Sequence, residues 1–397
     1  MRTSAVPFID LHAGEDTPAV RDAIDRVIAS GWFVLGPEVA AFEAEFATAC
    51  GAHHAIGVGN GTDAIALLLR AADIGAGDEV IVPAMTAAFT ALAVTAIGAT
   101  PVFADVDART LTLDPDAAAA AITSRTRAIV PVHLYGQAAD LDPLFTIAEQ
   151  HSLVIVEDCC QAHLASYRSA PVGTRGIGGA FSFYPTKNLG ALGDGGAVIT
   201  NDSTIADRIR RLRNGGQRDR YHHVEAGVNS RLDELQAAVL RARLPYLQKW
   251  TARRRELAGV YRGALPPPIR TVEERDRGHA YHLFAVCYGP PDHLRQGYGD
   301  PPKLHAKAEG GRHDIGASER DALQDHLRQA AIETLIHYPV ALTEQEAFAS
   351  YRRDPCPVSE RASRELLSLP LHPRMLDADV LHVTRAIERF VKGRVPQ

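Results

Sequence analysis

"HHAIGVGNGTDAIALLLRAADIGAGDEVIVPA" (residues 53–84) contains one strand–helix–strand unit. An apolar run at 53–59 precedes an amphipathic segment at 61–75, and a second apolar run follows at 78–84. Short apolar runs that alternate with helices of about ten to fifteen residues are typical of parallel sheets covered on both faces. The stretch therefore predicts an α/β fold with a mostly parallel sheet flanked by helices.

The same alternation continues to about residue 200 and defines a large domain, which we expect to span 1–245. Further strands are predicted at 100–106, 127–136, 153–158, 179–185 and 196–201, with helices at 86–98, 117–123 and 141–152. A helical pattern at 231–265, broken at Pro245, would lead the chain out of this domain.

A smaller C-terminal α+β domain is predicted at 246–397. We expect strands at 279–288 and 332–339 and helices at 318–330 and 358–367. The stretch at 289–317 is rich in glycine, proline and histidine, and it is predicted to be an exposed loop insertion.

Composition and charge exclude several classes of partner. The 397 residues are 46% hydrophobic and carry a net charge of −6, which argues against nucleic acid or an anionic membrane as the main partner. The sequence shows neither a signal-peptide pattern nor an apolar run of the roughly 20 residues that a membrane span needs. Its five cysteines are odd in number and lack metal-site spacing, so we expect reduced thiols, no metal site and a cytoplasmic location.

The residues that follow each strand are the first candidates for a site, because ligands of open parallel sheets bind at the carboxyl ends of the strands. Asn60, Gly61, Thr62 and Asp63 follow the first strand and open a helix. A helix start offers free N–H groups and a positive dipole end to a phosphate, and glycine lets the backbone approach closely. The alternative is an ordinary N-cap made by Asn60 or Thr62.

Asp158 ends the apolar run at 153–158, where an unpaired carboxylate would be costly. A protonated pyridine nitrogen would pair with it, and so would a structural salt bridge. Gln161 and His163 follow at spacings that place them in the same pocket or in a turn.

Lys187 lies in "FSFYPTKNLGALGDGGAVIT" (181–200), five residues after Ser182. A desolvated lysine forms Schiff bases with aldehydes, although a lysine in a glycine-rich loop is usually exposed. Pyridoxal 5′-phosphate needs a phosphate-binding site, a carboxylate for its ring nitrogen and a lysine. These needs are met on successive strand ends by the helix start at Gly61, the buried carboxylate of Asp158 and Lys187.

Seven motifs carry a resemblance to the fold-type I pyridoxal-phosphate enzymes of the DegT/DnrJ/EryC1/StrS family, the nucleotide-sugar aminotransferases. They are "GNGTDAI" (59–65), "PVHLYGQ" (131–137), "EDCCQAH" (157–163), "FSFYPTKNLGALGDGGAV" (181–198), "GVNSRLDELQAAVL" (227–240), "IETLIHYP" (332–339) and "LLSLPLHP" (366–373). The resemblance covers nearly the whole chain apart from 289–317, and it implies the fold-type I architecture for the two predicted domains.

The resemblance also implies a role for each matching residue. Lys187 would be the catalytic residue that holds the cofactor covalently and moves protons. The other cofactor contacts would be Asp158 at the ring nitrogen, Gln161 at the ring, and Gly61, Thr62, Asp63 and Ser182 at the phosphate. Asn229 would reach that phosphate from the neighbouring subunit of a homodimer, and His163 and Tyr184 would face the sugar. The aromatic residue that stacks on the ring in many relatives aligns with Ala87, and Phe89 lies nearby.

The implied activity is amination of a nucleotide-linked keto-deoxysugar, at carbon 3, with glutamate or glutamine as amino donor. Two alternatives stay open: an aminotransferase for a cyclitol or another keto substrate, and a non-catalytic regulatory protein on the same fold. Asp158, Ser182 and Lys187 are all present, which favours an enzyme. Dehydratases of this family carry histidine at the position of Lys187.

Overall fold

The computed structural model describes residues 5–12, 14–288 and 319–394. The predicted insertion at 289–317 lies outside these residues. Among the helices that the structure describes, none combines the length and the apolar character needed to span a membrane.

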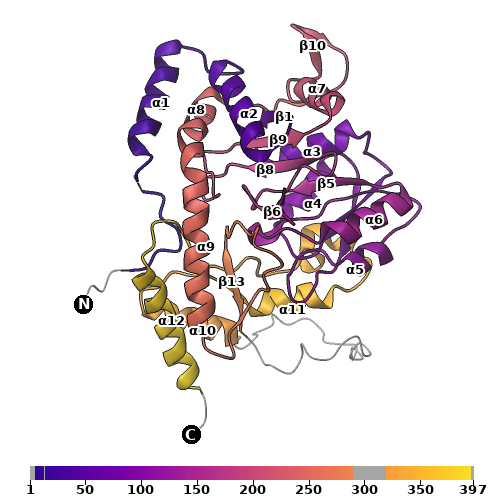
Figure 1. Cartoon of the computed structure of the whole chain (residues 1–397). Coiled ribbons are helices and arrows are strands. Elements are labelled where there is room, and N and C mark those ends of the chain that lie inside the picture. The colour runs from indigo at the N-terminus through magenta and orange to yellow at the C-terminus, as the bar shows by residue number, and fades with distance from the viewer. Residues whose placement is uncertain (1–4, 13, 289–318, 395–397) are drawn as a thin grey trace.

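A seven-stranded sheet in the order β1–β9–β8–β5–β4–β2–β3 forms the centre of the larger part of the molecule (Figure 1). Within this sheet, β9 runs antiparallel to its neighbours β1 and β8, and the remaining pairs are parallel. The carboxyl ends of all strands except β9 therefore meet at one edge. The strands are β1 (His54–Val58), β2 (Glu79–Pro83), β3 (Thr100–Ala104), β4 (Thr126–Ile129), β5 (Val154–Asp158), β8 (Gly178–Ser182) and β9 (Gly196–Thr200).

Helices cover both faces of this sheet, which explains the continuous apolar runs in its strands. In β2, Val80 and Val82 belong to the apolar core under α3 (Gly61–Ala71), α4 (Ala88–Ala96) and α7 (Ser203–Leu212). Ile81 lies between them and packs in the opposite core, against α5 (Pro115–Ala120) and α6 (Leu141–His151). The mostly parallel, doubly covered sheet confirms the predicted fold class.

The N-terminal helices α1 (Thr17–Ser30) and α2 (Pro37–Cys50) pack against α8 (Glu234–Arg243). A single 3₁₀ turn, Leu244–Tyr246, then separates α8 from α9 (Leu247–Ala264). Pro245 lies in this turn, where its missing N–H interrupts the helical hydrogen bonds. Figure 1 shows α8 and α9 nearly in line, with α9 reaching the C-terminal helices.

A second, three-stranded antiparallel sheet lies near the far end of α9. It consists of β12 (Arg270–Thr271), β13 (Phe284–Cys287) and β14 (Leu366–Leu369). Its apolar core includes Leu257 of α9, Val286 of β13, Leu323 of α10 (Glu319–Gln329) and Ile387 of α12 (Asp377–Lys392). Two short hairpins complete the strands: β6 (Ser166–Tyr167) with β7 (Ala170–Pro171), and β10 (Gln217–Asp219) with β11 (His222–His223).

Two expectations for the C-terminal part were wrong. The segment 332–339 is not a strand, because Ile332 and Leu335 form isolated bridges to two different segments and Pro339 offers no N–H for a ladder. The helix predicted at 358–367 is α11 (Pro357–Glu365), and it ends where Leu366 begins β14. There, pairing with β13 outweighs the helical pattern of the sequence.

Candidate active site

The carboxyl edge of the large sheet brings together the side chains expected to act as a unit. Asp158 is the last residue of β5, Ser182 is the last residue of β8, and Gly61 is the first residue of α3 after β1. Burial lowers the pKa of Lys187, while the nearby Cys160 and Asp158 oppose this shift. The structure therefore places Lys187 and Asp158 within electrostatic reach of each other.

Asp158 is a buried carboxylate with no cationic partner among the described residues. It is 4% exposed, and its Oδ2 accepts a hydrogen bond of 2.8 Å from the hydroxyl of Thr90. Its Oδ1 accepts the N–H of Cys160 at 3.0 Å. The alternative of a structural salt bridge is thus not found in the described part of the chain. A carboxylate in this state suits a cationic ligand, because an uncompensated buried charge is costly.

Gln161 is held from both sides by residues that the sequence analysis did not single out. Its Oε1 accepts the N–H of Tyr135 at 2.8 Å, and its Nε2 donates to the hydroxyl of Tyr338 at 2.9 Å. Tyr135 has a φ of 59°, a left-handed conformation that is uncommon for an aromatic residue. An amide nitrogen carries two hydrogens, so Gln161 keeps one donor for a ligand.

The start of α3 lies directly against Cys160 and Ser182. A Cβ on Gly61 would lie 2.6 Å from Cys160 Sγ and 2.9 Å from Ser182 Cβ, so glycine is needed for this close approach. The Asn60 side chain does form an N-cap, because its Oδ1 accepts the N–H of Asp63 at 2.9 Å. Among the described residues, no hydrogen bond uses the N–H of Gly61 or Thr62, so these two groups remain free for an anion.

The remaining candidate residues differ in their exposure to solvent. Tyr184 is 53% exposed, and Asn229 is exposed on the chain surface. His163 is 1% exposed and packs against the rings of Phe181 and Phe183, and burial lowers its pKa to about 3. His163 is therefore neutral at physiological pH.

Several contacts fix the loop that carries Lys187. The side chain of Asn188 donates to the carbonyl of Ala280 at 3.0 Å, and Arg243 donates to the carbonyl of Ala191 at 3.3 Å. A Cβ on Gly190 would lie 2.4 Å from the carbonyl oxygen of Pro185, so the loop folds this tightly because residue 190 is glycine. These contacts keep Lys187 at the end of β8.

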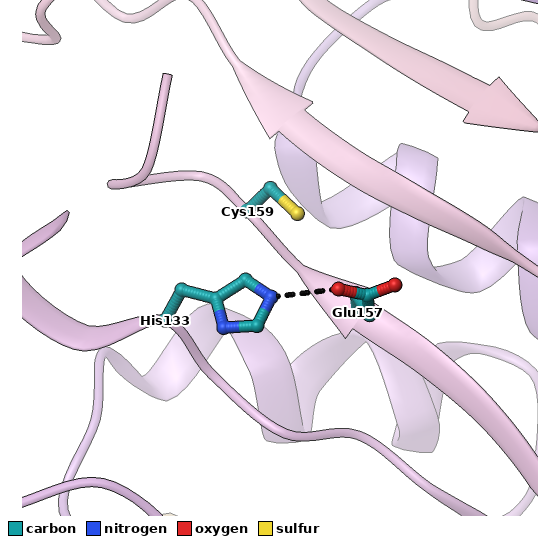
Figure 2. Close-up of side chains that lie close together, drawn as sticks. All are labelled: His133, Glu157 and Cys159. Atoms are coloured by element: carbon teal, nitrogen blue, oxygen red, sulfur yellow. Dashed lines mark hydrogen bonds and ion pairs between the residues drawn. The ribbon is translucent and has the colours of Figure 1, made fainter. Parts of the chain in front are cut away.

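His133, Glu157 and Cys159, the last two on either side of Asp158 in the sequence, form a buried cluster (Figure 2). Its potential ligand atoms lie within 4.8 Å of one another, which is a metal-like spacing. However, His133 Nδ1 accepts the N–H of Ala139 at 3.1 Å, so its Nε2 carries the proton and donates to Glu157 at 3.0 Å. Burial raises the pKa of the Cys159 thiol, which keeps it protonated.

The carboxylate of Glu157 is fully engaged. It also accepts the N–H groups of Gly173 at 2.7 Å, Arg175 at 3.0 Å and Gly176 at 3.1 Å. The cluster is therefore a structural pair of hydrogen-bonded side chains rather than a set of free metal ligands. It fixes the end of β5 at the residue before Asp158.

Comparisons with known proteins identify the family of this chain. A model of the DegT/DnrJ/EryC1/StrS aminotransferase family matches residues 15–294 and 311–388. A dTDP-3-amino-3,4,6-trideoxy-alpha-D-glucose transaminase of Streptomyces venezuelae is 44% identical over 402 residues, covering 100% of this chain and 98% of that protein. A dTDP-3-amino-3,6-dideoxy-alpha-D-galactopyranose transaminase of Aneurinibacillus thermoaerophilus is 43% identical, covering 97% of this chain and 99% of that protein.

Solved structures give the same result. DesV of S. venezuelae, solved in complex with a ketimine intermediate, superposes with a TM-score of 0.88 at 43% identity, covering 99% of this chain and 100% of that chain. NtdA of Bacillus subtilis, solved with bound cofactor PMP, has a TM-score of 0.84 at 27% identity, covering 98% of this chain and 86% of that chain.

The buried pair of His133 and Glu157 can be tested by stability. In Glu157→Gln an amide N–H₂ would face N–H donors, so we expect the free energy of unfolding at neutral pH to fall by about 3–5 kcal/mol in denaturant titrations. The pKa of Glu157 is lowered from 4.5 in the folded protein. The extra stability of the wild type over Glu157→Gln is therefore present above pH 4.5 and is lost as the pH falls below it. Glu149→Gln changes an exposed carboxylate on α6 and should have little effect; an equal loss in both variants would contradict this role.

The coupling of Lys187 to Asp158 can be tested in the cofactor-free protein. Asp158→Asn removes a charge that favours the protonated amine, so we expect the pKa of Lys187 to fall further. The measurement is the pH dependence of acylation of Lys187, followed by mass spectrometry. Asp142→Asn, which affects a surface carboxylate paired with Arg175, is the matched control. An unchanged or raised pKa in Asp158→Asn would exclude the coupling.

Proposed function

The chain belongs to the DegT/DnrJ/EryC1/StrS aminotransferase family, and from this premise we propose that it uses pyridoxal 5′-phosphate to aminate carbon 3 of a nucleotide-linked keto-deoxysugar. The observation that carries the proposal is the pair formed by Asp158, a buried carboxylate that forms no ion pair with another described residue, and Lys187, a desolvated lysine. The two residues lie on neighbouring strand ends of one sheet.

The residues present fit this cofactor. Asp158 would pair with the protonated ring nitrogen, and Thr90 orients its carboxylate. The remaining N–H of Gln161 would donate to an oxygen on the ring. The free N–H groups at the start of α3, together with Ser182, would hold the phosphate. NtdA, which has the same fold, was solved with PMP, the amino form of this cofactor.

When bound, the cofactor supplies an aldehyde that receives the amino group and a protonated ring that accepts electrons. Lys187 would hold the cofactor through Nζ until the donor amine displaces it. The freed amine would then take up the proton from the α-carbon of the donor in the first half of the reaction and deliver a proton to carbon 3 of the sugar in the second half. Its lowered pKa favours this exchange near neutral pH.

The choice of substrate rests on the relatives. The S. venezuelae and A. thermoaerophilus enzymes are both named for dTDP-3-amino sugars, and both cover nearly the whole chain. We assign the sugar contact to Tyr184, and the amino donor to glutamate or glutamine. Tyr184 is 53% exposed and lies three residues before Lys187, where a substrate can reach it.

We further propose a homodimer in which Asn229 reaches the cofactor phosphate of the partner. Large apolar side chains lie exposed around the start of α8: Trp32 is 57% exposed, Phe33 50% and Leu192 55%. Phe33 accepts a hydrogen bond from the N–H of Glu234, and Leu192 donates to the side chain of Gln236, which places them beside α8. An exposed apolar surface of this kind favours association with a second copy of the chain. Asn229 lies in the segment that leads into α8, next to this surface.

The covalent role of Lys187 gives the direct test. We expect borohydride reduction of the coloured protein to fix the cofactor on the peptide that contains Lys187, as seen by mass spectrometry. Lys187→Ala should fold, lose this adduct and lose amino transfer by several orders of magnitude. Lys249→Ala changes an exposed lysine and should keep both properties. Normal turnover by Lys187→Ala, or an adduct at another lysine, would refute the proposal.

A further inference from the structure

A cavity of about 220 Å³ opens beside Lys187. Its wall includes Lys187 and Asn188 from the lysine loop, Asp10 from the N-terminal segment, Arg254 from α9, and His372. Three parts of the chain therefore meet around one small space: the end of a strand in the large sheet, the N-terminal segment, and elements next to the small sheet.

Arg254 is a buried guanidinium without a counter-charge in the part of the chain that the structure describes. It is 4% exposed, and its Nη1 donates to the carbonyls of Tyr281 at 3.3 Å, His282 at 3.4 Å and Leu371 at 2.7 Å. Its Nε is buried without a hydrogen-bond partner. Burial lowers the pKa of Arg254 to about 10, so it remains charged at neutral pH.

His372 adds an unpartnered donor to the same wall. It is 5% exposed, and neither ring nitrogen has a hydrogen-bond partner among the described residues. Burial and the neighbouring Arg254 lower the pKa of His372 to about 4, so the ring is neutral and carries one N–H. Two side chains that are more than nine-tenths buried thus line one cavity, and each has a ring or guanidinium nitrogen without a hydrogen-bond partner among the described residues.

The other arginines of the cavity wall are compensated. Arg243 pairs with Asp16 at 2.9 Å, and Arg374 lies 3.4 Å from Asp10 and 3.7 Å from Asp16. A neighbouring cavity of about 460 Å³ is lined by charges that are likewise paired, such as Lys249 with Glu15. The uncompensated charge is therefore specific to Arg254, and it calls for an anion in the cavity beside Lys187.

We propose that this cavity binds a carboxylate of the amino donor, with Arg254 as its counter-charge and His372 as a neutral hydrogen-bond donor. The inference rests on the proposed function, because it assigns the cavity to the substrate that must deliver its amine at Lys187. The volume favours a small amino acid: 220 Å³ is below the roughly 300–1,000 Å³ of pockets for drug-sized ligands, and a nucleotide sugar is larger still.

Planar guanidinium groups suit carboxylates and phosphates alike, so the test must separate the donor from the diphosphate of the nucleotide. The probes are glutarate, which has the two carboxylates of glutamate but no amine, and thymidine diphosphate. Binding of each to the holoenzyme is measured by calorimetry, with glutaramide as the uncharged control for glutarate. Since glutarate cannot react, its binding is independent of turnover.

Arg254→Met should weaken glutarate binding by roughly 10- to 100-fold and leave thymidine diphosphate binding within about twofold, because one charged hydrogen-bonding partner is lost. Arg254→Lys keeps the charge and should retain part of the affinity. Arg255→Met removes the adjacent, exposed arginine outside the cavity and should have no effect. Loss of thymidine diphosphate binding with glutarate binding intact would overturn the assignment.

His372→Phe provides a second variant, because the ring of His372 makes no hydrogen bond to any residue that the structure describes. It should weaken glutarate binding by several-fold in a protein with wild-type thermal stability. Unchanged glutarate binding in both His372→Phe and Arg254→Met, or no binding to the wild type, would refute the inference. A wild type that binds glutarate through Arg254 but transfers no amino group would instead contradict the proposed function and support the anion site.

Discussion

The structure depends on one electrostatic constraint, a carboxylate buried at the end of β5 that forms no ion pair with another described residue. Asp158 has the hydroxyl of Thr90 and the N–H of Cys160 as its hydrogen-bond partners. A buried carboxylate of this kind is stable only if the surrounding residues fix its position and a ligand supplies the opposite charge. The His133–Glu157 pair fixes the residue before it, and Lys187 lies within electrostatic reach.

The parallel sheet places the buried carboxylate next to the other residues of the candidate site. Because the strands before Gly61, Asp158 and Lys187 run in the same direction, their carboxyl ends form one edge. The close approach of Gly61 to Ser182 then sets free N–H groups beside the same edge. Arg254, in the wall of the cavity beside Lys187, is a buried cation without a counter-charge among the described residues. Asp158 and Arg254 are thus two buried charged groups near one lysine.

Much of this arrangement follows from the sequence, because the strand-end rule requires no knowledge of side-chain contacts. It located Gly61, Asp158 and Lys187 from apolar runs and the residues after them. The supporting contacts could not be predicted in this way: Thr90 reaches Asp158 across 68 positions, and Tyr338 reaches Gln161 across 177. The errors at 332–339 and 366–367 have the same origin, since pairing with distant segments decided the local structure there. Arg254 lies in a basic run at 253–255 of the kind that is typical of a solvated helix face, and only its burial revealed the missing counter-charge.

The central claim is that Asp158 keeps the cofactor ring protonated. It is tested most directly by reconstituting the protein with pyridoxal 5′-phosphate labelled with nitrogen-15 in the ring and recording the nitrogen chemical shift across the neutral pH range. The account predicts a protonated ring nitrogen in the wild type throughout that range and an unprotonated one in Asp158→Asn. An unprotonated ring nitrogen in the wild-type protein at neutral pH would contradict it.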